Sequence, residues 1–211
     1  MINVVFDLDG TLFNTFNIHI ACVKEVVKCM CDKKISTLQL INQNTSTLNS
    51  QLVALCGKEK YREAKYCYRK CFCRLIDQGI IYDTVDVRKV LYQFKGQNNI
   101  EYNLFTGRDS FTTKVILKYF DIESIFSSIV CCDKMYEAKL SQKNLNTAFP
   151  EIARNVYITD DLREYKNVKK SGVETYIANW FASVKYNDIQ TLKQIDDLVL
   201  LMEKLAYEQF I

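Results

Sequence analysis

Two aspartates separated by a single residue stand directly after an apolar run near the N-terminus. Within "VVFDLDGTLF" (residues 4–13), Asp7 and Asp9 follow Phe6 and lead into an expected turn at Gly10 and Thr11. Aspartate and glycine after a strand often form only a turn. A buried strand that ends in two carboxylates can also hold them rigidly for nucleophilic attack, proton transfer or metal binding.

Later apolar segments are also followed by residues that can do chemistry. These residues are Thr106, Gly107 and Arg108 after "NLF", Lys139 beyond "IVCC", and Asp160 and Asp161 after "VYIT". Taken alone, each could belong to a turn, a helix cap or a solvated surface. Ligands bind outside the carboxyl ends of the strands in an open parallel sheet, so the sequence predicts that these side chains converge at one edge.

A cluster of carboxylates at one edge would repel itself unless a cation were bound there. Hard oxygen ligands of this kind suit Mg²⁺. We therefore predict a site in which Asp7 is delivered rigidly to a place where a metal ion and a phosphate group can meet.

The order of apolar patterns predicts the elements that would position these residues. Strands are expected at 2–6, 100–105, 127–132, 155–159 and 173–180, and helices at 15–31, 58–76, 110–120 and about 140–148. A last helix would carry Leu192, Ile195, Val199, Met202 and Leu205 on one side. This alternation predicts an α/β fold with a parallel sheet, helices on both faces, and a helical insertion at 15–84 between the first strand and the rest.

Composition excludes several other classes of protein. The 211 residues carry a net charge of +3 with both signs mixed, and 48% of them are hydrophobic. That is enough for one sizeable core, and the charge balance does not suggest a nucleic-acid or membrane-surface protein. The sequence has neither a run of the roughly 20 apolar residues that a membrane span needs nor a secretory signal pattern, so we expect a cytoplasmic protein.

The nine cysteines are expected to be reduced thiols that pack as small hydrophobic residues. The alternative is a metal cluster built from Cys29, Cys31, Cys67, Cys71 and Cys73. Its C-x-C pairs do not have typical zinc spacing.

The segment from Lys58 to Arg74 interleaves basic and aromatic residues, as single-stranded nucleic-acid sites do. However, Tyr61, Lys65 and Tyr68 share one helical side with ordinary amphipathic spacing. We therefore interpret the segment as a solvated helix and expect no nucleic-acid partner.

Four motifs together resemble the haloacid dehalogenase (HAD) superfamily of phosphotransferases. They are "DLDGT" (7–11), "LFTGR" (104–108), Lys139 and "ITDDLRE" (158–164), in the order found in that family. The resemblance implies a Rossmann-like catalytic core formed by 1–14 and 85–211. It also implies that 15–84 is a small helical cap, as in phosphoglycolate phosphatase-like and β-phosphoglucomutase-like members.

The resemblance also implies a role for each matching residue. Asp7 would be the nucleophile, and Asp9 would be the general acid and base. Thr106 would donate a hydrogen bond to the phosphoryl group, and Lys139 would neutralise charge on the nucleophile and the phosphate. Asp160 would hold Mg²⁺ together with Asp7 and the backbone carbonyl of Asp9.

Three further residues are assigned to substrate binding. Gly107 and Arg108 belong to the second motif, and His19 lies early in the first helix of the expected cap, where capped members often place a histidine. A polar residue at a junction between helices is the equally weighted alternative for His19.

Some positions depart from the pattern of the family. Leu140 follows the lysine where proline is usual, which leaves Lys134 and Lys143 as alternatives to Lys139. Glu164 stands where a second aspartate is common, and Asp161 could share its duty. Asn14 also occupies a position that is often acidic in capped members. None of these departures removes a group that the chemistry requires.

The sequence thus predicts a Mg²⁺-dependent phosphatase that hydrolyses a small phosphomonoester metabolite through an aspartyl-phosphate. A sugar phosphomutase with the same site is one alternative, and a non-catalytic regulatory protein that keeps the fold is another. We expect a monomer or weak homodimer without a membrane partner. The sequence does not identify the phosphorylated substrate.

Overall fold

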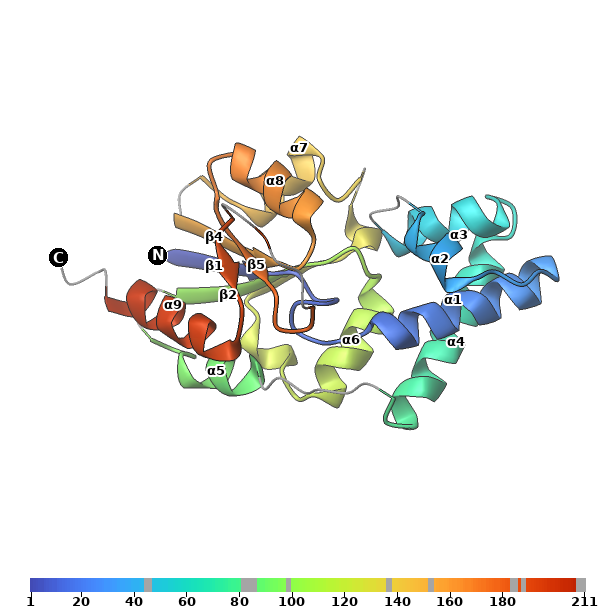
Figure 1. Cartoon of the computed structure of the whole chain (residues 1–211), viewed down its shortest axis with the longest axis horizontal. Helices are drawn as coiled ribbons and strands as arrows, with labels where there is room; N and C mark the ends of the chain where they lie inside the picture. Colours follow the sequence, from blue (N-terminus) through green and yellow to red (C-terminus); the bar gives the residue numbers. More distant parts are fainter. Residues whose placement is uncertain are drawn as a thin grey trace.

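A parallel sheet forms the centre of the molecule (Figure 1). The computed structural model describes residues 1–43, 47–80, 87–97, 100–135, 138–151, 154–182, 186 and 189–207. Within this part of the chain the sheet has six strands in the order β3-β2-β1-β4-β5-β6. They are β1 (Ile2–Phe6), β2 (Ile100–Phe105), β3 (Ser128–Val130), β4 (Arg154–Thr159), β5 (Glu174–Ala178) and β6 (Thr191–Leu192). All neighbouring strands run parallel, so their carboxyl ends share one edge.

Helices cover both faces of the sheet. One face carries α5 (Val87–Gln93), α6 (Ser110–Tyr119) and α9 (Ile195–Tyr207), and the other carries α7 (Gln142–Ala148) and α8 (Leu162–Lys170). Alternate side chains of a strand point to opposite faces. Val4 and Phe6 therefore enter the cluster of the first face, whereas Val5 enters that of the second. Burial on both sides explains why β1 is apolar at every position except Asn3.

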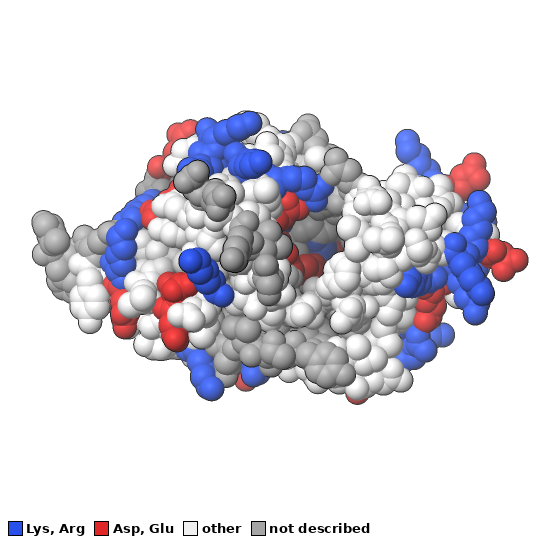
Figure 2. All heavy atoms as spheres, viewed as in Figure 1, with Lys and Arg blue, Asp and Glu red and all other residues white. Residues whose placement is uncertain are grey.

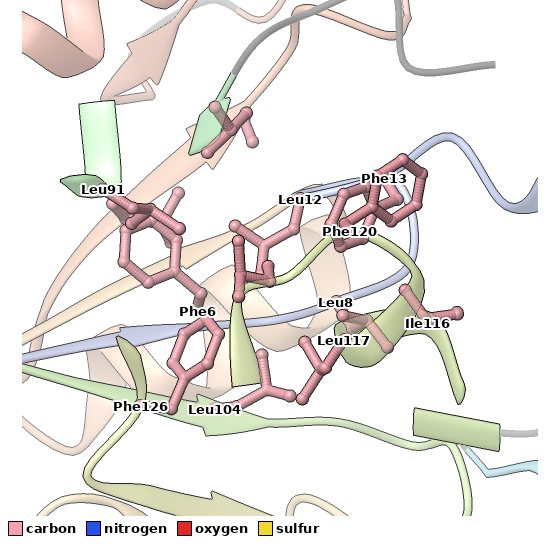
Figure 3. Close-up of a cluster of buried hydrophobic side chains, with 14 of the residues drawn as sticks. Phe6, Leu8, Leu12, Phe13, Leu91, Leu104, Ile116, Leu117, Phe120 and Phe126 are labelled. Atoms are coloured by element: carbon pink, nitrogen blue, oxygen red, sulfur yellow. The ribbon is translucent and has the colours of Figure 1, made fainter. Parts of the chain in front are cut away.

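Apolar side chains anchor the polar turn that follows β1. Leu8 and Leu12 are fully buried, and the ring of Phe13 stacks on that of Phe120 with centroids 4.1 Å apart (Figure 3). Between them, Gly10 adopts a positive φ of 76° and its amide donates to the carbonyl of Phe13 at 2.8 Å. The turn therefore leaves the core only for a few residues and returns to it at once.

A helical insertion follows this turn. It consists of α1 (Phe16–Cys31), α2 (Thr37–Ile41), α3 (Leu48–Cys56) and α4 (Tyr61–Asp77), and its described residues contain no strand. Ser36 and Thr47 start α2 and α3 with capping boxes. We call these four helices the helical lobe. In Figure 1 it lies to the right of the sheet, beyond the carboxyl ends of the central strands.

A partly buried ion pair joins the helical lobe to the core. Asp109 is fully buried and caps α6, where its carboxylate accepts from the amide of Thr112. The same carboxylate accepts from Nε of Arg69 on α4 at 2.6 Å, and the Arg69 Nη2 atom lies 2.5 Å away. One aspartate thus satisfies the start of a core helix and holds a lobe helix against it.

The predicted α/β fold with an inserted helical region is confirmed, and most predicted elements lie within a few residues of the observed ones. The placement of Leu192 in the last helix was wrong, because this residue forms β6 beside β5. The predicted third strand is shorter than expected, because Cys132 starts a 3₁₀ turn. Tyr68 is fully buried and not on a solvated side of its helix. The expected boundary at 84/85 lies outside the described residues.

All nine cysteines are free thiols. Within the described ranges, no group of three or more histidine, cysteine, aspartate or glutamate side chains is arranged to hold a metal ion. No described helix is both long and apolar enough to cross a membrane.

Candidate active site

A cavity of about 530 Å³ lies between the carboxyl edge of the sheet and the helical lobe. Its floor includes Asp7, Asp9, Gly107, Lys139 and Asp160, which come from four separate segments of the core. Figure 2 shows the molecular surface hollowed between the two parts, with acidic atoms visible inside. The predicted convergence of polar residues at one sheet edge therefore occurs in the structure.

Asp7 and Lys139 form the centre of the floor. The Nζ atom of Lys139 lies 2.6 Å from Oδ1 of Asp7, and both side chains are buried. Lys134 and Lys143, the two alternatives, are exposed. Burial and the neighbouring carboxylates raise the pKa of Asp7 despite the opposing charge of Lys139, and the two carboxylates beside Lys139 raise its pKa. Lys139 is therefore a permanent cation against the predicted nucleophile.

Glu164 holds Lys139 from the other side. Its Oε2 atom accepts from Nζ of Lys139 at 2.8 Å, from the hydroxyl of Tyr157 at 2.5 Å and from the hydroxyl of Thr159 at 3.1 Å. All of these groups are buried, and Tyr157 and Thr159 lie on β4. Glu164 thus orients the lysine, and its carboxylate is committed to that network.

The turn after β1 positions Asp160 at the end of β4. The amide of Asp160 donates to the hydroxyl of Thr11 at 2.9 Å, and the indole nitrogen of Trp180 donates to the carbonyl of Thr11 at the same distance. Gly10 leaves room for the carboxylate, because a Cβ atom at that position would lie 2.1 Å from Oδ2 of Asp160. Only a residue without a side chain allows this close approach.

Asp9 binds Arg108. The guanidinium donates through Nη2 to Oδ1 of Asp9 at 2.6 Å and through Nε to Oδ2 at 3.1 Å, and Thr15 donates to the same carboxylate. Burial alone would raise the pKa of Asp9, but Arg108 and Thr15 together hold it below its usual value. Arg108 was predicted to bind substrate, and here its guanidinium faces the second acid of the motif.

The helical lobe contributes a polar chain to the roof of the cavity. Nη1 of Arg108 donates to the hydroxyl of Tyr68 at 3.3 Å, and this hydroxyl lies 2.9 Å from Nδ1 of His19. Because the guanidinium can only donate, the Tyr68 hydroxyl accepts from it, and the tyrosine proton can bind Nδ1 when the hydrogen of neutral His19 is on Nε2. The side chain of Gln51 also lies beside His19 in the lining of the cavity.

Burial and the charge of Arg108 lower the pKa of His19 to about 4. His19 therefore lines the cavity as an uncharged group at neutral pH. Tyr68 and Gln51 were missed by the sequence interpretation, because their helical positions look like ordinary amphipathic spacing.

The donor set at the floor fits a hard divalent cation. Burial and the neighbouring Glu164, Asp161 and Asp9 carboxylates raise the pKa of Asp160 to about 7, which reflects acid groups crowded without enough positive charge. Asp7 and Asp160 supply two carboxylates that line the same cavity. Mg²⁺ usually takes one or two carboxylates and completes its shell with water and substrate oxygens. A ligand set of this kind does not need a third acidic side chain.

Two other residues of the motifs have structural partners. Asp161 caps α8 by accepting from the amides of Arg163 and Glu164, and it forms an ion pair with the side chain of Arg163. The hydroxyl of Thr106 is fully buried and accepts from the amide of Arg108 at 3.2 Å.

Solved structures share this fold at low sequence identity. CbbY from Rhodobacter sphaeroides, solved in complex with phosphate, is 16% identical with a TM-score of 0.78, over 93% of this chain and 95% of that chain. A mutant of CbbY was solved with xylulose-(1,5)bisphosphate and gives a TM-score of 0.75 at 16% identity, over 91% of this chain and 93% of that chain. A candidate β-phosphoglucomutase from Thermotoga maritima gives 0.66 at 18% identity, over 97% of this chain and 100% of that chain.

The sequence matches a family model but no individual curated protein. The family model for haloacid dehalogenase-like hydrolases matches residues 4–178, and the chain therefore belongs to the haloacid dehalogenase-like hydrolase family.

Proposed function

We propose that this protein is a Mg²⁺-dependent phosphatase that hydrolyses a small phosphomonoester through an aspartyl-phosphate on Asp7. The observation that carries this proposal is the buried contact of 2.6 Å between Asp7 and Lys139, on the floor of a cavity that also contains Asp9 and Asp160. A structural ion pair would not need a cavity in front of it or a second acid two residues later.

In the first step a carboxylate oxygen of Asp7 attacks phosphorus, and the bond between phosphorus and the ester oxygen breaks. Lys139 stays protonated and offsets the negative charge that gathers on the nucleophile and the phosphoryl oxygens. Glu164 keeps the ammonium group in place through this change. Thr106 and Gly107 are proposed to support the phosphoryl group from the end of β2.

Asp9 would give a proton to the departing oxygen and later take one from the attacking water. That water breaks the acyl-phosphate, which releases inorganic phosphate and restores Asp7. The contact with Arg108 holds Asp9 ionised, which suits the base of the second step. The acid step requires the carboxyl group to turn from Arg108 towards the leaving oxygen.

Asp7, Asp160 and the backbone carbonyl of Asp9 would hold the Mg²⁺ ion. When bound, Mg²⁺ offsets the mutual repulsion of nucleophile and phosphate and stabilises the charge of the transition state.

We further propose that residues 15–84 act as a cap over the core of 1–14 and 85–211. The four helices of the lobe form the roof of the cavity, and His19 and Gln51 face into it. A lid of this kind excludes bulk water from the reacting groups and favours a small substrate over a macromolecule. Residues 81–85, which join the proposed cap to the rest of the core in the sequence, lie outside the described residues.

Turnover of a phosphometabolite panel by the purified chain in Mg²⁺ tests the proposal, with p-nitrophenyl phosphate as a generic ester. Asp7→Asn should abolish turnover, because an amide cannot form the acyl-phosphate. The matched control is Asp121→Asn, at an exposed aspartate outside the cavity whose positive φ of 54° asparagine also tolerates. If Asp7→Asn retained activity within tenfold of the wild type, the proposed nucleophile would be wrong.

A further inference from the structure

The roof of the cavity differs in charge from its floor. On the side of the helical lobe, residues between 15 and 68 line the cavity. The described ones among them include no lysine, arginine, aspartate or glutamate. They are Thr15, Phe16, His19, Ile20, Leu40, Ile41, Gln43, Thr47, Leu48, Gln51 and Tyr68. The part of a substrate that lies under the roof therefore meets amides, hydroxyls and apolar groups.

The basic residues of the lobe are used elsewhere. Arg69 binds Asp109, Arg74 binds Glu25, and Lys60 donates to the carbonyl of Met30. In Figure 2 the lysine and arginine atoms of the lobe gather at its outer edge, away from the hollow. The neutral roof is thus not a consequence of a lobe that lacks basic residues.

The three basic residues that line the cavity are all paired with carboxylates. Lys139 lies between Asp7 and Glu164, and Arg163 pairs with Asp161 at 2.7 Å. Arg108 is buried against Asp9 and its guanidinium carbon lies 4.6 Å from the centroid of the Phe72 ring. A second anionic group of a substrate would have to compete with Asp9 for the guanidinium of Arg108.

The cavity lining also has more negative than positive charge. Among the described residues that line the cavity, five carboxylates stand against three basic side chains, an excess that one divalent cation would cancel. With the cation bound, the charges of the described lining balance, so a second anion beside the reacting phosphoryl group would meet no net positive charge. An anion placed under the neutral roof would lose part of its hydration and gain no cationic partner among the described residues there.

Polar groups on the roof are suited to hydroxyl groups. The side-chain oxygen of Gln43 is buried and has no hydrogen-bond partner in the described part of the chain, so it can accept from a substrate hydroxyl. A carboxylate or a second phosphate, which only accepts hydrogen bonds, would leave this oxygen unsatisfied.

We infer that the preferred substrate is a phosphomonoester with an uncharged, hydroxyl-bearing leaving group, and that compounds with a second anionic group are rejected. This inference rests on the proposed function, because it takes the floor of the cavity as the phosphoryl site. It separates this chain from CbbY, which was solved with a bisphosphate. It also favours hydrolysis over a phosphomutase reaction, in which transfer of phosphate to a second hydroxyl passes through a bisphosphate.

Binding to the full-length Asp7→Asn variant in Mg²⁺, measured by calorimetry, tests the inference without turnover. Two pairs of compounds differ by one anionic group: glycerol 3-phosphate with 3-phosphoglycerate, and fructose 6-phosphate with fructose 1,6-bisphosphate. In each pair, the compound whose only anionic group is its phosphate should bind at least about tenfold more tightly, since an unpaired second anion costs well over 1.4 kcal/mol. Equal or tighter binding of the compounds with two anionic groups would overturn the inference, as would a failure of all four compounds to bind.

A charge placed on the roof provides the second test. Gln51→Lys, combined with Asp7→Asn, should move the binding preference towards the compounds with two anionic groups by about tenfold or more. Leu38→Lys adds the same charge at an exposed position of α2 that does not line the cavity, and it should leave the preference unchanged. An equal effect of both lysines would show that overall charge, and not the roof, sets the preference, which would refute the inference.

Wild-type turnover distinguishes this inference from the proposed function. If the compounds with a single anionic group bind more tightly but are not hydrolysed, the phosphatase proposal fails and the inference about the roof holds. If a bisphosphate both binds more tightly and is hydrolysed, the phosphatase proposal holds and the inference fails.

Discussion

Substitution of Glu164 by glutamine should destabilise the fold strongly, although the two side chains have nearly the same shape. The carboxylate accepts from Lys139, Tyr157 and Thr159 in a buried network. Glutamine keeps one acceptor oxygen, removes the charge and turns an amide donor towards groups that also donate. The lysine is then buried with Asp7 as its remaining carboxylate partner in this network.

The size of the effect follows from the number of contacts that change. Hydrogen bonds to charged groups contribute roughly 1.5–3 kcal/mol each, and removing one partner of a buried ion pair costs roughly 3–5 kcal/mol. Because Asp7 still binds Lys139, we expect a loss at the lower end, about 3 kcal/mol. For a chain of this size each 1 kcal/mol lowers the melting temperature by roughly 2–4 °C, so the decrease should be about 6–12 °C.

Thermal unfolding followed by circular dichroism, at pH 7.5 without added metal, measures this decrease. Glu174→Gln is the matched control, because Glu174 also accepts from a basic side chain, Arg154, and a tyrosine, Tyr176. Its pair with Arg154 is partly exposed and should contribute no more than about 1 kcal/mol. If both variants melted at the same temperature, the buried network around Lys139 would not contribute as argued.

Three further predictions concern the metal and the roof of the cavity. EDTA should stop turnover and added Mg²⁺ should restore it, whereas Ca²⁺ should inhibit, because its larger and looser coordination fits in-line geometry poorly; full activity in EDTA would exclude the metal site. The single histidine gives an unambiguous NMR signal, and His19 should titrate with a pKa of about 4; a titration near 6.5 would contradict the buried neutral form. Because the pKa of His19 is lower in the folded than in the unfolded chain, its contribution to stability should be complete above pH 6.5 and be lost as the pH falls through 4; denaturant unfolding of the wild type and His19→Gln between pH 7 and 4 measures it, and an equal loss in both would refute the assignment.

The sheet could be predicted because its strands are apolar on both faces. β1 is buried throughout, β2 and β4 end in buried residues, and each strand is followed by a polar turn, a pattern that is visible without any structure. β6 was missed because two residues are too few for periodicity, and Leu192 continues the apolar spacing of α9. Local pattern alone cannot distinguish a short edge strand from the start of a helix.

The side chains at the floor could be predicted from their positions after strands, but their partners could not. The motif indicates that Asp9 and Arg108 lie near each other, yet only the fold shows that the guanidinium binds this carboxylate. Glu164 looks like an ordinary residue in the first turn of a helix, where acidic residues are common for another reason. Tyr68 and Gln51 lie in the insertion, and which side of their helices faces the core depends on how the lobe packs.

The glycine in the turn after β1 has a consequence for how this protein can vary. A Cβ atom at position 10 would lie 2.1 Å from the Asp160 carboxylate, and the backbone there has a positive φ. The collision begins with the first carbon, so alanine already meets the obstacle that tryptophan meets. A saturation mutagenesis library at Gly10 should therefore give a flat fitness profile, in which every replacement is similarly defective whatever its size or polarity. At most tolerant surface positions, fitness would instead vary with the size and polarity of the replacement. A variant scan alone can therefore identify position 10 by the uniform defect of its replacements.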